Sequence, residues 1–315
     1  MNRLITLMQR EYWENKGAFR TTPIVIFGLY IVGMLMAIWT TVHFDNDLYT
    51  FTEAVQLLAE QPESKRAIVF YNATLFSPWL FTLVLSIVVF FYLLGSLYDD
   101  RKDRSILFWK SLPASDTLTL LSKLLTAMFL APLTFFTIFI LSQLAMGLIG
   151  SIMVLSVGEN PWTLFFSVFN PVKAWGFTLL TYLAMSFWAL PLYGWLMLVS
   201  SFAPRVPLLF AILPPVVLAV LQIWIKFLET FTFKGNLFGI IGQWYSNSPM
   251  IMYLDERNNN IVAGLGIPIF DDFDHAMTVA NIFDRLFSLQ MLAGAGIAVV
   301  CLAGALWMRH RATDN

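Results

Sequence analysis

Long apolar runs separated by shorter polar segments dominate the hydrophobic pattern of this chain. Several runs extend for about 20 residues or more, the length that an α-helix needs to cross a bilayer. They predict six transmembrane helices, over residues 23–42, 78–97, 118–152, 172–199, 207–228 and 286–308. Because proline lacks the backbone donor of a helix interior, we expect Pro132 to kink the third span and Pro214–Pro215 to break the fifth.

Residues 1–22 precede the first span and have a two-sided helical pattern. Apolar and basic or polar side chains fall on opposite faces: Leu4, Ile5, Met8 and Tyr12 on one, and Arg3, Thr6 and Arg10 on the other. This pattern favours an interfacial helix, the alternative being an ordinary cytosolic cap on the first span. Trp13 and Lys16 continue the aromatic and basic mixture typical of headgroup depth.

The polar segments carry further helical patterns. Residues 51–60, and then residues from 64 onward, are expected to form short helices between the first two spans. The longest polar region, 229–285, is expected to hold short extracytoplasmic helices before the last span, and residues 309–315 form a tail.

Composition supports an all-α integral membrane protein. The chain has 315 residues, of which 58% are hydrophobic and only 12% are charged, whereas soluble domains carry about 25% charged residues. Cys301 is the single cysteine, so a disulfide within the chain is impossible.

The basic residues predict the orientation. They are denser on the side of the two termini, in residues 1–22, 98–117, 200–206 and 309–315, than on the opposite side. The positive-inside rule therefore places both termini in the cytoplasm.

The sequence contains few motifs that are typical of catalytic, cofactor-binding or metal sites. The spans carry almost no charge, which argues against an ion-coupled or proton-coupled transporter. The chain has no P-loop and no zinc-binding pattern, so we expect no cofactor, no metal, no catalytic site and no nucleic-acid partner. The acidic run 271–275, Asp-Asp-Phe-Asp-His, could hold a cation or simply cap a following helix.

The densest charged segment follows the second span. It reads YDDRKDRSILFWKSLPAS over residues 98–115 and joins a charged start to an apolar Ile-Leu-Phe-Trp run. Ser115 is the expected N-cap of the third span. Phe108 and Trp109 are either anchors for a protein partner, because aromatic side chains dominate binding hot spots, or residues of the membrane interface.

The order of parts resembles the permease subunit of ATP-binding-cassette (ABC) exporters of the ABC-2 type. The most specific match is residues 98–123, where charged residues, a short helix, the Leu112–Pro113–Ala114–Ser115 turn and Lys123 follow one another. Many members have Gly-Thr where this chain has Arg104–Ser105.

The resemblance implies a subunit of the plasma (inner) membrane of a bacterium. It would pair with a second permease subunit, as a homodimer or a heterodimer, and two copies of an ABC ATPase, carrying ATP and Mg²⁺, would dock below in the cytoplasm. Residues 98–117 would be the coupling segment. Its implied contacts are Asp100, Arg101, Arg104, Ile106, Phe108, Trp109 and Lys110, and a second contact is Pro204 with Arg205.

The expected function is therefore outward movement of a substrate, with ATP hydrolysis left to the partner. Uncharged, aromatic-rich spans favour an amphipathic or lipid-like substrate. The alternative is a membrane scaffold that recruits a cytosolic partner without transport. A membrane-embedded enzyme is disfavoured because no catalytic side chains cluster near either interface.

Overall fold

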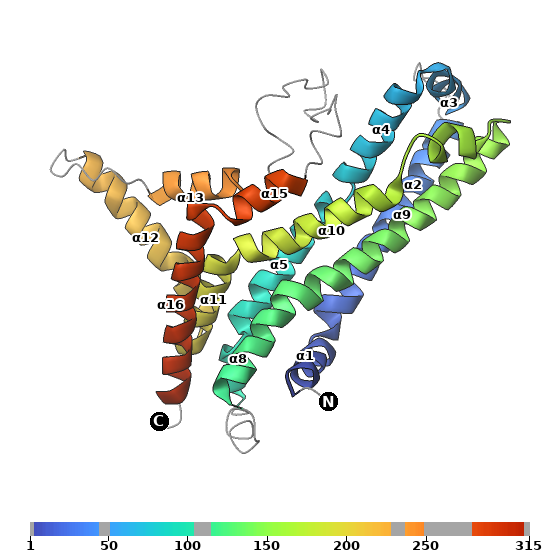
Figure 1. Cartoon of the computed structure of the whole chain (residues 1–315). Helices are drawn as coiled ribbons and strands as arrows, with labels where there is room; N and C mark the ends of the chain where they lie inside the picture. Colours follow the sequence, from blue (N-terminus) through green and yellow to red (C-terminus); the bar gives the residue numbers. More distant parts are fainter. Residues whose placement is uncertain (1–2, 44–50, 104–114, 228–236, 249–278, 312–315) are drawn as a thin grey trace.

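The structure is a computed structural model that describes residues 3–43, 51–103, 115–227, 237–248 and 279–311, and all its regular elements are helices. The described helices form a bundle, with α1 and the C-terminal end of α16 at the same end (Figure 1). We call this the charged end.

Within the described residues, the first half of the chain has seven α-helices and a π-helical turn. They are α1 (Arg3–Glu14), a π-helical turn (Gly17–Thr21), α2 (Thr22–His43), α3 (Phe51–Glu60), α4 (Glu63–Phe76), α5 (Trp79–Ser96), α6 (Tyr98–Lys102) and α8 (Asp116–Leu125). The expected helices over 51–60 and from 64 onward are confirmed as α3 and α4.

The second half continues directly from α8. It comprises π-helical turns (Thr126–Leu130 and Trp162–Phe166), α9 (Ala131–Ser156), α10 (Pro171–Trp188), α11 (Leu190–Phe202), α12 (Pro207–Phe227), α13 (Leu237–Ser246), α15 (Val279–Leu286) and α16 (Leu289–Arg311). The short helices expected before the last span correspond to α13 and α15; residues 229–236 and 249–278, including the acidic run 271–275, lie outside the described residues.

Among the described residues, four helices are long and apolar enough to cross a membrane. They are Gly17–Thr40, Glu63–Lys102, Asp116–Ser156 and Leu289–Arg311. A fifth candidate is α10 together with α11, which are bent by 51° at the break between them. The predicted span 207–228 corresponds to α12, which is apolar over the shorter stretch Pro207–Gln222. These helices indicate a multi-pass membrane protein.

Prolines at three places in the spans have different effects on the helices. Pro191 follows the break between α10 and α11, where the chain bends. Pro132 stands at the start of α9, directly after a π-helical turn. The expected break at Pro214–Pro215 is wrong, because α12 continues through both residues.

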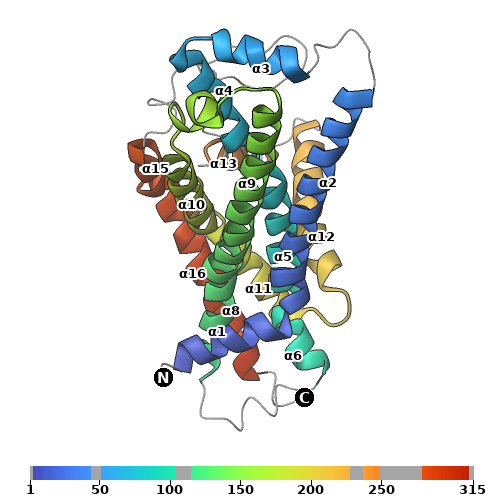
Figure 2. The same cartoon turned by 90° about the vertical axis from the view of Figure 1, so that its right-hand side faces the viewer.

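Helix α1 lies across the charged end, nearly perpendicular to the spans (Figure 2). Ile5 and Trp13 are 51% and 63% exposed, and Arg3, Lys16 and Arg20 are also exposed. The opposite face packs on α8, with Glu11 buried in the contact. The position of α1 at a membrane interface stays a prediction.

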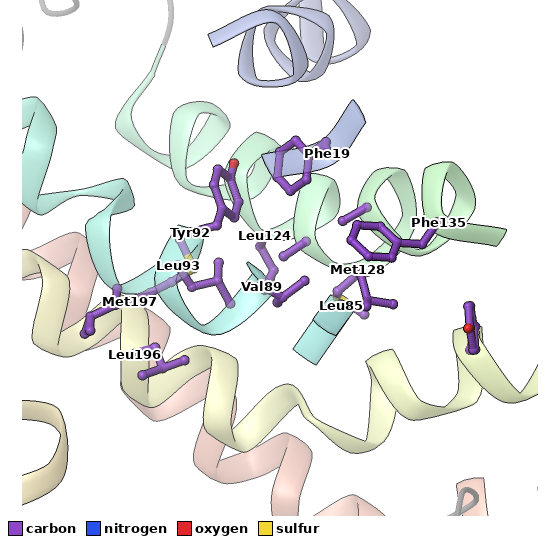
Figure 3. Packing of buried hydrophobic residues seen from close by; sticks show 14 of the residues in the cluster. Phe19, Leu85, Val89, Tyr92, Leu93, Leu124, Met128, Phe135, Leu196 and Met197 are labelled. Atoms are coloured by element: carbon purple, nitrogen blue, oxygen red, sulfur yellow. The ribbon is translucent and has the colours of Figure 1, made fainter. Parts of the chain in front are cut away.

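The main core lies where α5, α8, α9 and α11 meet (Figure 3). Phe19, just before α2, contacts the ring of Tyr92 with centroids 5.0 Å apart. Leu93 and Met197 are fully buried beside them. The core thus joins the N-terminal segment to both halves of the bundle and fixes the helix ends at the charged end.

Small residues let α11 and α16 approach closely. A Cβ on Gly194 would lie 3.0 Å from the backbone oxygen of Ala298 and 3.2 Å from Cβ of Cys301. Close backbone approach of this kind is typical of helix pairs in membranes.

Helix α13 lies against the bend between α10 and α11, away from the charged end (Figure 1). The indole nitrogen of Trp188 donates to the backbone oxygen of Trp244 at 3.1 Å, and their rings lie 4.8 Å apart. The Trp244 ring fills the space beside Gly294, where a Cβ would come within 2.1 Å of it.

Candidate functional site

Six charged side chains from four helices meet at the charged end. Arg10 and Glu11 come from α1, Asp100 from α6, Asp116 and Lys123 from α8, and Arg309 from α16. Glu11, Lys123 and Arg309 are only 1%, 3% and 3% exposed. We call these six residues the ion-pair chain.

The signs of charge alternate along the ion-pair chain. Lys123 Nζ lies 3.2 Å from Glu11 Oε1 and 3.6 Å from Asp100 Oδ1. Arg309 Nη1 lies 3.1 Å from Asp100 Oδ2, and Arg309 Nε lies 2.9 Å from Asp116 Oδ1. Arg10 closes one end, with Nη2 2.5 Å from Glu11 Oε1.

Charge balance explains how so many ions are buried together. Three carboxylates face three cations, so each buried charge has a partner of opposite sign. The Tyr92 hydroxyl adds a hydrogen bond to Glu11 Oε2 at 2.9 Å. Burial of ions costs several kcal/mol each unless pairing and hydrogen bonds offset it. The chain therefore favours the one arrangement of α1, α6, α8 and α16 in which all pairs form.

The environment of Glu11 keeps it ionised. Burial alone would raise its pKa, but the charges of Lys123 and Arg10, with hydrogen bonds from Tyr92 and Arg10, outweigh burial and hold the pKa below its ordinary value.

A serine of α11 caps the junction between α5 and α6. The helix is interrupted at Leu97, and the backbone N–H groups of Leu97 and Tyr98 both donate to Ser200 Oγ at 2.9 Å. Gly95 provides room at this junction, because a Cβ there would lie 2.7 Å from Asp99 Oδ2. The absence of a side chain at Gly95 therefore lets the Asp99 carboxylate lie against the end of α5.

Helix α6 is also tied to the link between α11 and α12. Arg101 Nη2 donates to the backbone oxygens of Ser200 and Ala203, at 2.9 and 2.8 Å. The Tyr98 hydroxyl donates to the backbone oxygen of Arg205 at 2.7 Å. The described start of the segment 98–117 is thus adjacent to the link between α11 and α12.

The structure describes four of the nine predicted contact residues. Asp100 is 9% exposed, and its carboxylate points into the ion-pair chain. Arg101 is half-buried against the α11–α12 link, whereas Pro204 and Arg205 are exposed. Arg104, Ile106, Phe108, Trp109 and Lys110 lie outside the described residues.

Of the six members of the ion-pair chain, only Asp100 was predicted from the sequence as a functional contact. Glu11 was not selected, although it follows Leu4 and Met8 at helical spacing on the buried face of α1, where an acid is out of place. Arg309 was assigned to a tail. Lys123 was noted only as part of the family motif. Ser115 was correctly expected as an N-cap, since its Oγ accepts from Leu118 N at 3.2 Å.

Neither metal chemistry nor a known relative adds to this picture. Within the described part of the chain, no group of three or more His, Cys, Asp or Glu side chains is placed to hold a metal ion. Comparison of the chain with protein-family models, with characterised proteins and with solved structures gives no match.

Proposed function

We propose that the chain is the permease subunit of an ABC exporter of the ABC-2 type, with six spans and a cytoplasmic charged end. Two such subunits would form the path for an amphipathic or lipid-like substrate. Separate ATPase subunits would supply ATP hydrolysis and would dock on residues 98–117 and on Pro204 and Arg205.

One observation carries the proposal: the described start of the charged segment is connected to four parts of the bundle. Asp100 joins α6 to α8 and α16 through ion pairs. Tyr98 and Arg101 join it to the end of α11 and to the link before α12. A displacement of this segment by a partner would therefore act on several helices together.

The mechanism follows from rigid-body motion. Closure of the partner ATPases would push on residues 98–117 in each permease subunit, and packed helices respond to such a push by tilting as units. The bend between α10 and α11, with Trp244 seated on it, lies at the other end of the same helices. Tilting of α11 at the charged end would thus alter the contact that holds α13.

The decisive experiment is purification of the chain together with a P-loop ATPase, where one is encoded beside its gene. Phe108→Ala with Trp109→Ala should remove the ATPase from the purified complex while the permease still inserts. The matched control is Trp162→Ala with Phe166→Ala, an exposed aromatic pair away from the charged end, which should retain the ATPase. Normal recovery of the ATPase with the first double variant would contradict the docking site.

Stimulation of ATP hydrolysis separates transport from scaffolding. In lipid, the complex of an exporter should hydrolyse ATP faster when an amphipathic substrate is added. An ATPase that binds the chain but never changes its rate of hydrolysis with the chain or with any substrate would favour the scaffold alternative.

A further inference from the structure

Among the described contacts, Asp100 is the one acid of the ion-pair chain whose cations both lie closer to another acid. Lys123 is closer to Glu11 (3.2 Å) than to Asp100 (3.6 Å). Arg309 is closer to Asp116 (2.9 Å) than to Asp100 (3.1 Å). If the Asp100 carboxylate moved out of the ion-pair chain, the pairs Glu11–Lys123 and Asp116–Arg309 would remain. Neither cation would then be buried without a counter-charge.

Glu11 and Asp116 differ from Asp100, because each is the nearest acid to a buried cation, Lys123 and Arg309 respectively. Loss of Glu11 leaves Lys123 with the more distant Asp100, and Arg10 with Glu14, which is half-exposed. The arrangement therefore has one position at which an acid can leave at small electrostatic cost, because a buried ion is costly chiefly when it lacks a partner. That position lies on α6, which has only five residues.

The junction before α6 does not rely on the hydrogen bonds of a continuous helix. The N–H groups of Leu97 and Tyr98 bond to a side chain of α11 rather than to carbonyl groups of α5. Their satisfaction therefore does not depend on a continuous helix from α5 into α6. Arg101 reaches the backbone of Ser200 and Ala203, beside the same point, and keeps α6 near it.

We propose that α6 is a hinged arm, with its pivot at Leu97–Tyr98 on Ser200 and its latch at Asp100. In the latched state Asp100 holds the arm to α8 and α16. In the released state Asp100 moves into water, and the two remaining ion pairs keep α1, α8 and α16 together. The proposal rests on the proposed function only for the force that opens the latch; the hinge itself is a property of this chain.

Distance measurements between spin labels test the latch without any ATPase. Cysteines replace Lys102 on α6 and Thr117 on α8, both exposed, in a Cys301→Ala background, and the labelled chain is placed in lipid nanodiscs. With Asp100 present the distance distribution should be single and narrow. Asp100→Asn should broaden it and shift it to longer distances, whereas Asp100→Glu, which keeps the charge, should retain the short distance.

The matched control is Asp103→Asn, which removes an exposed carboxylate of the same segment outside the ion-pair chain. It should leave the distribution unchanged. Amide exchange of a peptide containing Leu97 and Tyr98 gives a second measurement, and Asp100→Asn should speed it by about tenfold, the effect of losing hydrogen bonds to a charged group.

Two outcomes would overturn the proposal. One is that Asp100→Asn matches the unmodified chain in both distance and exchange, because the latch then holds nothing. The other is that Asp103→Asn has the same effect as Asp100→Asn, because general loss of negative charge would then explain the change. Since the sample holds no ATPase, neither outcome bears on whether an ATPase docks, and failure of docking leaves the hinge untouched.

Discussion

At the scale of single residues, the charged end depends on Glu11. This carboxylate is the only one in the ion-pair chain contributed by α1. It forms ion pairs with Arg10 and Lys123 and accepts a hydrogen bond from the Tyr92 hydroxyl. Glu11→Gln keeps the shape but removes the charge, leaving Lys123 poorly compensated. We expect a loss of about 3–5 kcal/mol in the free energy of unfolding, the range for removal of one partner from a buried pair.

Thermal unfolding in detergent, followed by tryptophan fluorescence, checks this expectation. Glu14→Gln is the matched control, since Glu14 lies on the same helix, is half-exposed and pairs with Arg10 at 3.2 Å. An exposed pair of this kind is worth about 0–1 kcal/mol. Equal effects of the two variants would contradict a special role for Glu11.

The lowered pKa of Glu11 predicts a dependence on pH. Because the folded pKa lies below the ordinary value of 4.5, ionised Glu11 stabilises the fold fully above that value, and this stabilisation is lost as the pH falls through the folded pKa. The difference in unfolding temperature between the unmodified chain and Glu11→Gln should be present at neutral pH and shrink below pH 4.5. A difference that stays constant over this range would contradict the prediction.

Residue patterns in the sequence could identify part of this site. Asp100 and Arg101 stand out because they fall in a charged segment beside apolar spans. Their partners do not, because Glu11, Lys123 and Arg309 are separated from Asp100 by long stretches of chain. Helical spacing shows that Glu11 shares a face with apolar residues, but only the packing of α1 on α8 shows which cation it meets.

At the scale of helices, Ser200 holds the junction between α5 and α6. Ser200→Ala removes the acceptor of two backbone N–H groups, and we expect a loss of about 2 kcal/mol or more, since each buried donor left unsatisfied costs about 1–3 kcal/mol. Thermal unfolding measures it. Ser201→Ala is the control, because Ser201 is also buried but its Oγ bonds only to Leu198 O of its own helix. A larger effect of Ser201→Ala would contradict the assignment.

The contact between α11 and α16 predicts a second effect at this scale. Gly194→Leu places a side chain against the backbone of Ala298, and overpacking of a tight contact costs about 1–3 kcal/mol or more. Gly296→Leu is the matched control, because a Cβ at Gly296 meets nothing within 4 Å. Thermal unfolding should separate the two variants, and equal stability would show that the helices are not in close contact.

The sequence predicts the helices more reliably than their interruptions. Runs of apolar residues locate α2, α5, α9 and α16 because each must bury or face lipid along its whole length. The bend before Pro191 and the continuity of α12 through Pro214–Pro215 both depend on neighbouring helices, which can satisfy or displace the carbonyl that a proline leaves without a donor. A proline alone therefore does not decide between a break and a continuous helix.

At the scale of the whole molecule, charge and polarity divide the bundle into two ends. The ion-pair chain joins α1, α6, α8 and α16 at the charged end, whereas contacts between Trp188 and Trp244 hold α13 against the bend between α10 and α11. Helix α11 runs between these regions: Ser200 lies at its charged end, and Pro191 beside Trp244 lies at its other end. Any coupling between the ends has a direct structural route through this helix.

The proposed six-span topology predicts on which side of the membrane α13 lies. If α12 crosses the membrane with the other apolar helices and the charged end is cytoplasmic, α13 lies outside. Tyr245, 60% exposed on α13, should then react as Tyr245→Cys with a membrane-impermeant maleimide in intact cells, in a Cys301→Ala background. Thr117→Cys, exposed at the charged end, should react only after the cells are permeabilised. Labelling of Tyr245→Cys only after permeabilisation would place α13 in the cytoplasm, and the proposed topology would have to be abandoned.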